Sequence, residues 1–448
     1  MNLKGLGKVV ANMGFLLQIT GLLLILPVAI GLQNGELQSV ASLITTCFIA
    51  FGVGFFFNAF AERKKLDERT SLWLMLLTFT VIPLLLMIPY VWNNVFNSTN
   101  IIDLFSNSYF EAISGFTTTG FSFVSNPALL PSSLLFYRSL IQFIGGVGFI
   151  YILIAFLYKK EEIDEFCDTF GIEKIGGSLK ALLLTVMLVY TFFIVIFTAI
   201  FYYTYQPNLI IASCAAIDIL TGGYQPTITA GIGLFQVSII LLMFIGALNF
   251  RFHYNLFHLK LRELLTPEIK LFLGIIAAST IIISILAWIN PFDSLFHVVS
   301  MISSTGAEYI SIDAMPIAAK IYFIILMLIG GCTFSMAGGI RIQRFQKLID
   351  AIRKNEDAPT RDELKTIIVF LITFIAFLFI LSFAFSFSGT SMLDSVFEIG
   401  SALSTNGVSM GATTINLPVI YKWLMIIAML VGRVEILTIY KAIRGTRD

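Results

Sequence analysis

Charged residues are scarce in this chain, and their scarcity excludes most soluble proteins. Asp, Glu, Lys and Arg make up 12% of the 448 residues, whereas soluble domains carry about 25%. Apolar residues instead reach 57%, and the mean hydropathy is +0.90. A membrane-spanning helix needs about 20 apolar residues, so the chain has room for about ten spans. These features predict an all-α integral membrane protein.

Signals of catalysis and of metal binding are also absent. The four cysteines are scattered without the spacing of metal ligands, and we interpret them as small core residues. The apolar runs contain no His-Glu-x-x-His motif and no paired aspartates, so we expect no enzyme. The net charge of +1 gives no sign of a nucleic-acid partner, and none is expected.

The first 68 residues predict a helical hairpin. Two apolar runs, Met13–Leu32 and Val40–Phe60, are joined by the polar turn Gln33-Asn34-Gly35-Glu36. The first run lacks a small-residue cleavage site. We therefore interpret it as a retained span and not as a signal peptide.

A short turn that combines glycine with small polar residues occurs four times in the remaining chain. Its copies are Phe116–Phe121, Leu220–Tyr224, Ser304–Ala307 and Thr405–Val408. Ten residues before the aligned glycine, three copies carry phenylalanine and the second carries serine; these residues are Phe110, Ser213, Phe296 and Phe397. The recurrence predicts four structural units with pseudo-fourfold symmetry.

Each unit is predicted to run as span, half-helix, turn and span. The half-helices, all too short to cross a bilayer, are Tyr109–Gly115, Asn208–Leu220, Phe292–Ser303 and Met392–Leu403. In the second unit we expect Leu234–Phe257 to be one continuous span. After the hairpin 1–68, the predicted unit boundaries are 69–175, 176–266, 267–362 and 363–448.

Basic residues predict how the chain is oriented. The loops that these spans place on one side of the membrane hold 24 of the 28 Lys and Arg residues. Basic loops stay on the cytoplasmic side. The four turns are therefore expected to open toward the outside.

The four turns are a candidate cation site. Backbone carbonyls in a ring can replace the water shell of an alkali cation, and glycine adopts the positive φ that such turns need. The partly negative C-terminal end of each half-helix would point at the same place. The candidate ligands are Thr118, Thr119, Gly120, Thr221, Gly222, Gly223, Thr305, Gly306, Asn406 and Gly407.

A second candidate site is a glycine-rich stretch, residues 330–340, in the third unit. Its four glycines are Gly330, Gly331, Gly338 and Gly339, and glycine inside a helix costs about 1 kcal/mol relative to alanine. The stretch is predicted to leave the helix, and its glycine pairs at both ends would permit a hinge. The family resemblance given below implies that it gates a pore below the turns. The alternative is close helix packing through small residues.

Arg433 lies inside the last apolar run. A charge at that depth is costly and is usually functional or paired. The family resemblance given below implies that it lies by the permeation path, where it would repel cations or tether the gate. The alternative is an ion pair with Glu435 or with another buried acid, Asp218, Glu111 or Glu398.

These motifs resemble the Trk/Ktr/HKT superfamily of potassium-uptake proteins, and in particular its TrkH-like membrane subunits. Further matching stretches are Gln142–Gly148, Gly330–Arg341 and Gly432–Ile436. The resemblance implies a channel-like pore with a potassium ion bound at Gly120, Gly223, Gly306 and Gly407. It also implies a homodimer in the lipid of a prokaryotic plasma (inner) membrane, with a cytosolic nucleotide-binding regulatory subunit of the TrkA/KtrA kind.

Two alternatives stay open at this point: a sodium-permeable pore, and an ion-coupled secondary transporter (a symport protein). Asn406 in the fourth turn and Glu308 after the third depart from the family pattern, which leaves the choice between potassium and sodium open. Coupled transporters are typically built from inverted repeats, whereas these four repeats share one orientation. Glu308 is interpreted either as a cation-concentrating carboxylate at the outer mouth or as a solvated loop acid.

Overall fold

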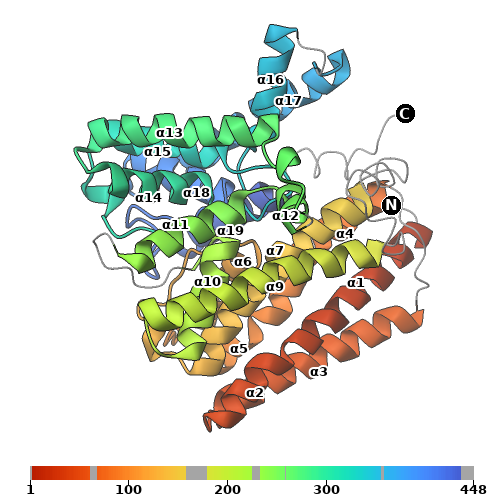
Figure 1. Ribbon diagram of the computed structural model, residues 1–448. Coiled ribbons are helices and arrows are strands. Elements are labelled where there is room, and N and C mark those ends of the chain that lie inside the picture. Colours follow the sequence, from red (N-terminus) through yellow and green to blue (C-terminus); the bar gives the residue numbers. More distant parts are fainter. Residues whose placement is uncertain are drawn as a thin grey trace.

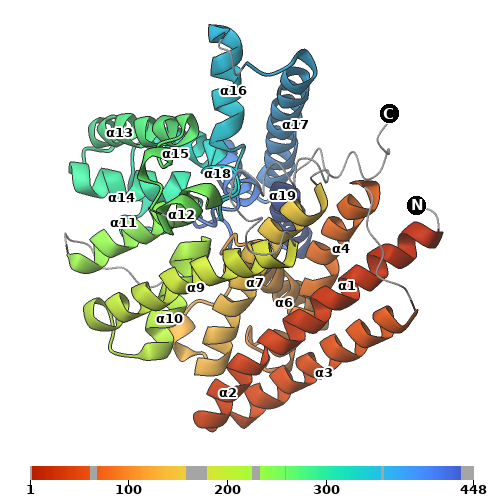
Figure 2. The same ribbon diagram turned by 45° about the vertical axis from the view of Figure 1, so that its right-hand side comes forward.

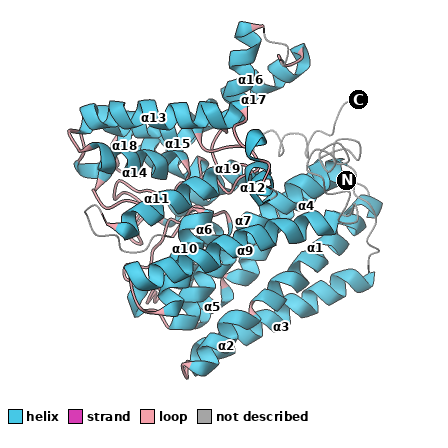
Figure 3. Cartoon of the chain, in the orientation of Figure 1, coloured by secondary structure: helices cyan, strands magenta, loops and turns pink. Residues whose placement is uncertain are grey.

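The computed structural model describes residues 3–60, 68–157, 179–224, 233–257, 259–354 and 358–434. Within these ranges the chain forms α-helices and short 3-10 helices joined by loops, with no strand (Figure 3). Six of the described helices are long and apolar enough to cross a bilayer, or seven if one bent pair counts as a span. The chain is therefore a multi-pass, all-helical membrane protein.

The N-terminal segment forms an antiparallel pair at one edge of the molecule. Helix α1 (Leu3–Leu23) continues into α2 (Ile25–Gln33), and α3 (Leu37–Phe60) returns beside α1 (Figures 1 and 2). Gly35 makes the reversal with a φ of 71°, which glycine adopts without steric cost. Gly14 and Gly54 let the two helices approach closely, because each faces the backbone oxygen of the other.

Four short helices occupy the middle of the fold. They are α6 (Ile101–Phe116), α10 (Leu209–Thr221), α14 (Pro291–Ile302) and α18 (Met392–Leu403). Each begins at a side-chain cap that accepts a backbone N–H of the first turn; the caps are Asn100, Asn208, Asn290 and Ser391. At about 1.5 Å per residue, none spans an apolar core of about 30 Å.

Helix α6 is longer than the sequence predicted. Its predicted start was Tyr109, but the helix begins at Ile101, where Asn100 caps it and Asp103 lies in the first turn. The intervening residues 106–108 are polar and yet buried. Because the prediction relied on apolar runs, these polar residues caused it to miss the first half of the helix.

Other helices surround the four short ones. They are α4 (Glu68–Leu86) with α5 (Ile88–Trp92), α7 (Ser132–Leu157), α9 (Leu179–Thr204), α11 (Leu234–Ala247), α13 (Pro267–Ala287), α15 (Ile317–Ile329), α17 (Arg361–Ser386) and α19 (Val419–Val434). Each short helix packs between the helices that precede and follow it. Each also contacts a helix of the preceding group: α10 meets α7, α14 meets α11, α18 meets α15, and α6 meets α19. Because α6 of the first group contacts α19 of the last, the four groups of helices form a closed ring.

The prediction of one continuous span over Leu234–Phe257 was wrong. Helix α11 ends at Ala247, and α12 (Phe250–Phe257) leaves it at an angle of 107°. The carbonyl oxygens of Gly246 and Ala247 accept hydrogen bonds from the N–H groups of Met336 and Cys332, at 3.1 and 3.0 Å. The 330–340 loop thus supplies partners that a continuous helix would take from its own next turn.

Beyond that loop, α16 (Ile342–Arg353) and the start of α17 extend away from the rest of the helices (Figure 2). Their connection begins α17 with a capping box, in which Thr360 and Glu363 satisfy each other's backbone N–H groups. Three single-turn 3-10 helices, η1 (Pro127–Leu129), η3 (Leu261–Glu263) and η4 (Ile312–Ala314), lie in the connecting loops.

Three of the surrounding helices carry a glycine against the last turn of a short helix. These glycines are Gly145 of α7, Gly246 of α11 and Gly432 of α19. A Cβ atom on any of them would overlap a carbonyl oxygen of the short helix that it faces. Small residues are what allow helices to pack at this distance in a membrane.

Gly145→Ala should therefore lower the melting temperature of the purified protein, because the new methyl group would overlap the Phe116 carbonyl. Overpacking of this kind costs about 1–3 kcal/mol. Gly148→Ala on the same helix is the matched control, since a Cβ atom there meets nothing within 4 Å. Equal melting temperatures for the two variants would contradict the close approach.

Candidate functional site

The four turns meet at one place, although about 100 residues separate most of them in sequence. A Cβ atom added to a glycine of one turn would overlap the backbone of a neighbouring turn. The pairs, with the glycine first, are Gly120 and Gly223, Gly222 and Ser304, Gly306 and Asn406, and Gly407 and Thr119. The first turn thus touches the second, the second the third, the third the fourth, and the fourth the first. Backbone groups of all four turns close a ring, and side chains at these glycines would force it apart.

The first, third and fourth turns share one backbone conformation. The residue two before the glycine is left-handed, with φ of 57° at Thr118, 57° at Ser304 and 51° at Thr405. The residue before the glycine donates its N–H to a serine carbonyl five residues back; these bonds are Thr119 to Ser114, Thr305 to Ser300 and Asn406 to Ser401. The repeated sequence pattern therefore encodes a repeated local structure.

The second turn is built differently. Gly222 and Gly223 both have positive φ, 74° and 145°. Gln142 of α7 holds this turn: its amide nitrogen donates to the Thr221 hydroxyl and to the Gly222 carbonyl, both at 2.8 Å. Its amide oxygen accepts the N–H of Tyr224 at 3.2 Å. Sequence analysis had included Gln142 in a family motif without giving it a role.

The ring presents oxygen atoms that the protein leaves open. In the part of the chain that the structure describes, no hydrogen bond reaches the carbonyl oxygens of Thr119, Thr305 or Asn406. The hydroxyl oxygens of Thr118 and Thr405 are also buried without a partner. Buried polar atoms normally have partners, and four helix C-termini add partial negative charge here. The arrangement favours a cation.

Two buried glutamates hold the chain segments that follow the first and fourth turns. Glu111 accepts the hydroxyl of Ser122 at 2.9 Å and the N–H of Phe123 at 3.0 Å. Glu398 makes the matching bonds, at 2.7 and 2.8 Å, to the residues eleven and twelve positions after it. Sequence reasoning missed this role. The sequence pattern that could have indicated it is that each glutamate lies nine residues before the glycine of its turn.

The 330–340 loop lies against the helix-end side of the ring. The N–H of Gly338 donates to the Ser304 hydroxyl at 3.1 Å, and a Cβ atom on Gly338 would overlap Thr405. Met336 and Thr118 meet the same face of α7 at Gly146. The loop therefore reaches the third and fourth turns directly and lies next to the first.

Arg433 is placed against this loop. Its side chain is 2% exposed, and its guanidinium donates to the Met336 carbonyl at 3.1 Å. Of the acids considered as alternative partners, Glu111 pairs with Arg138, and Glu398 binds the segment after the fourth turn. Glu435 lies outside the described residues.

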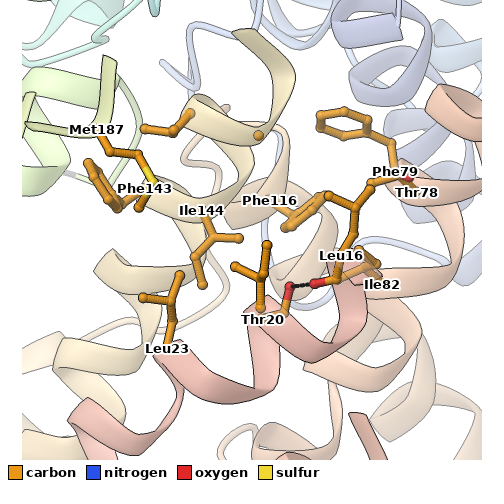
Figure 4. Close-up of a pocket in the computed structure, with 13 residues that line it drawn as sticks. Leu16, Thr20, Leu23, Thr78, Phe79, Ile82, Phe116, Phe143, Ile144 and Met187 are labelled. Carbon is orange, nitrogen blue, oxygen red and sulfur yellow. Dashed lines mark hydrogen bonds between the residues drawn. The ribbon is translucent and has the colours of Figure 1, made fainter. Parts of the chain in front are cut away.

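An apolar pocket lies behind the first turn and is not suited to an ion. It is lined from α1, α4, α6, α7 and α9, with Phe116, Ile144 and Met187 facing it (Figure 4). Thr20 contributes a hydroxyl, but this group donates to the Leu16 carbonyl at 2.8 Å. Among the described residues, no charged side chain lines the pocket, and an ion in such surroundings would lack ligands.

A multi-pass helical protein in which buried oxygen atoms of the described residues gather without hydrogen-bond partners has the features of an ion-transport protein. Residues 234–444 match the family model TrkH, which is described as a cation transport protein. Over this part of the chain, which is just under half of its length, the protein is similar to the TrkH cation transport proteins, and the match indicates a transporter and not an enzyme.

Similarity to relatives extends over nearly the whole chain. It is 27% identical to an uncharacterized cation transporter of Methanocaldococcus jannaschii, over 97% of this chain and 95% of the relative. It is 24% identical to the Trk system potassium uptake protein TrkH of Salmonella typhimurium, over 88% and 89%. The crystal structure of the potassium transporter TrkH from Vibrio parahaemolyticus has the same fold, with a TM-score of 0.82, 19% identity and 99% coverage of both chains.

Glu308, which follows the third turn, has an unusual protonation equilibrium. Burial raises the pKa of its carboxyl group to about 7, although a hydrogen bond to the Ile312 backbone acts in the opposite direction. The group is therefore neutral at acid pH and negative at alkaline pH. A carboxylate so close to the ring would raise the local cation concentration.

Cation influx into liposomes should therefore rise as the outer pH increases from about 6 to about 8, with a midpoint near the pKa of about 7. Glu308→Gln should remove this rise and hold influx at its low-pH value. The measurement is initial influx at fixed voltage. A pH profile that is identical in the variant would show that Glu308 does not act on the permeating cation.

Proposed function

We propose that the four turns are a selectivity filter and that this protein conducts potassium ions into the cell, driven by the membrane potential. The observation that carries the proposal is the closed contact of the four turns, whose open carbonyl oxygens face no protein donor. Such oxygens can replace the hydration shell of a potassium ion. The names of the relatives, Trk system potassium uptake proteins, point to the same ion.

The proposed ligands are main-chain oxygens of the ring. They come from Thr118, Thr119, Gly120, Thr221, Gly222, Gly223, Thr305, Gly306, Asn406 and Gly407. The Gly222 carbonyl also accepts a bond from Gln142, so Gln142 would orient the second turn. The Asn406 amide donates to the Met301 carbonyl at 2.8 Å, so Asn406 would offer the ion its main chain and not its side-chain nitrogen.

We also propose how the rest of the chain is arranged around this filter. Four units of span, half-helix and span, with boundaries 69–175, 176–266, 267–362 and 363–448, surround one pore and follow the hairpin 1–68. The cyclic packing of α6, α10, α14 and α18 supports this assignment. The turns face outward across a prokaryotic plasma membrane, because the basic loops lie on the other side.

The 330–340 loop is the proposed gate. Gly330 and Gly339 have φ of 72° and 82°, so these two positions, with Gly331 and Gly338 beside them, give the loop backbone freedom at both ends. Arg433 holds the loop closed through the Met336 carbonyl. A homodimer and a cytosolic nucleotide-binding subunit of the TrkA/KtrA kind complete the proposal, with the projecting α16 as the element that such a subunit would reach (Figure 2).

Gly120→Ser should lower the preference for potassium over sodium. Gly120 has a φ of 90°, and a side chain there would overlap Gly223 and widen the ring. The measurement is the ratio of potassium to sodium flux in liposomes, and a drop of about tenfold corresponds to about 1.4 kcal/mol. Gly274→Ser is the matched control, because a Cβ atom at Gly274 meets nothing within 4 Å. An unchanged ratio in Gly120→Ser would remove the filter assignment.

Deleting residues 333–337 should raise potassium flux in the absence of any regulatory subunit. The deletion removes Met336 and with it the bond from Arg433 and the contact next to the first turn. Flux is compared in liposomes with equal amounts of monodisperse protein. Flux at or below the level of the unmodified protein, in a deletion variant that elutes normally, would contradict the gate.

A further inference from the structure

A pocket with polar side chains at its rim and floor lies beside the ring, between the first two turns, on the side that the proposed orientation turns outward. It is separate from the apolar pocket of Figure 4 and encloses about 350 Å³. Asn126 and Gln206 are exposed at its rim, while Arg138 and Asp218 are buried at its floor. Gly120 also lines it, so the pocket reaches the back of the first turn. We call it the outer side pocket.

The positive charge at the floor is already balanced. The Arg138 guanidinium donates to the Glu111 carboxylate at 2.8 and 3.1 Å, and both side chains are almost fully buried. Arg138 also lies over the ring of Tyr224, 4.0 Å from its centre. Such a paired and stacked guanidinium is held in place. Its charge is matched by Glu111, which does not line the pocket.

Asp218 is the acid of this site that has no basic partner among the described residues. Its side chain is 7% exposed and hydrogen-bonds with Ser139, and no described residue bonds its oxygen Oδ1. A buried carboxylate without full pairing is costly. Arg138 and Asp218 are the charged side chains among the described residues that line the pocket. With Glu111 included, the site holds two acidic side chains and one basic side chain.

We propose that the outer side pocket binds one monovalent alkali cation, partly hydrated, against the Asp218 carboxylate. The volume of about 350 Å³ corresponds to roughly ten water molecules at about 30 Å³ each, so an ion fits with part of its shell. One carboxylate and few rigid protein oxygens bind a hydrated ion and do not strip it. The site therefore takes sodium and potassium alike, unlike the ring proposed above.

The position of the site gives it a role. Asp218 belongs to α10, which leads directly into the second turn, and the pocket shares Gly120 with the first. A cation held there lies next to the ring without being in line with it. It balances the negative charge of an ionised Asp218 behind two of the four turns.

The test is anomalous scattering from crystals of the full-length protein equilibrated with rubidium ions. We expect a rubidium peak against the Asp218 carboxylate in the unmodified protein and its loss in Asp218→Asn. Asp313→Asn is the matched control, because Asp313 is an exposed aspartate bound to Lys320 and far from the pocket lining. Gln206→Glu adds a carboxylate at the rim and should raise the occupancy about twofold or more.

No peak at Asp218 in the unmodified protein, or a peak that survives Asp218→Asn, would overturn the proposal. If Asp218→Asn does not fold, Gln206→Glu decides, and unchanged occupancy in that variant would count against the site. The proposed function is tested separately in the same maps. Rubidium at Asp218 without rubidium in the ring would contradict the filter and leave the outer side pocket standing.

Discussion

A backbone carbonyl that accepts no hydrogen bond is costly inside a bilayer, and this protein gathers several such groups in one ring. The four short helices end there, and the oxygens of Thr119, Thr305 and Asn406 face no donor in the described chain. A cation bound in the proposed filter would relieve this cost, since it would take the place of water at these oxygens. The surrounding fold follows from the need to hold those ends together, as shown by the glycines that let α7, α11 and α19 approach them.

All four turns contribute backbone to the ring, but different side chains hold each turn in place. Glutamates brace the first and fourth from within their own units, and a glutamine from α7 braces the second. The third is supported from below, where Ser304 binds the 330–340 loop. The four turns therefore contact one another in one ring but are held by different side chains.

The 330–340 loop couples the ring to the rest of the molecule. It replaces helical hydrogen bonds at the break between α11 and α12, and Arg433 binds it from α19. A movement of the loop would therefore break bonds in the second and fourth groups of helices at once. That is the behaviour expected of an element with two discrete arrangements rather than of a passive linker.

The sequence alone determined the membrane class, the family and the four glycine turns, because apolar run length, local repeats and positive-φ glycines are properties of neighbouring residues. It located the short helices well where their pattern is apolar, as in Met392–Leu403, and poorly where buried polar residues interrupt it, as in α6. The tertiary structure decided the break in α11, the role of Gln142 and the partner of Arg433. Those features depend on hydrogen bonds between residues some 80 to 100 positions apart, and no local pattern encodes which distant group will supply the missing partner.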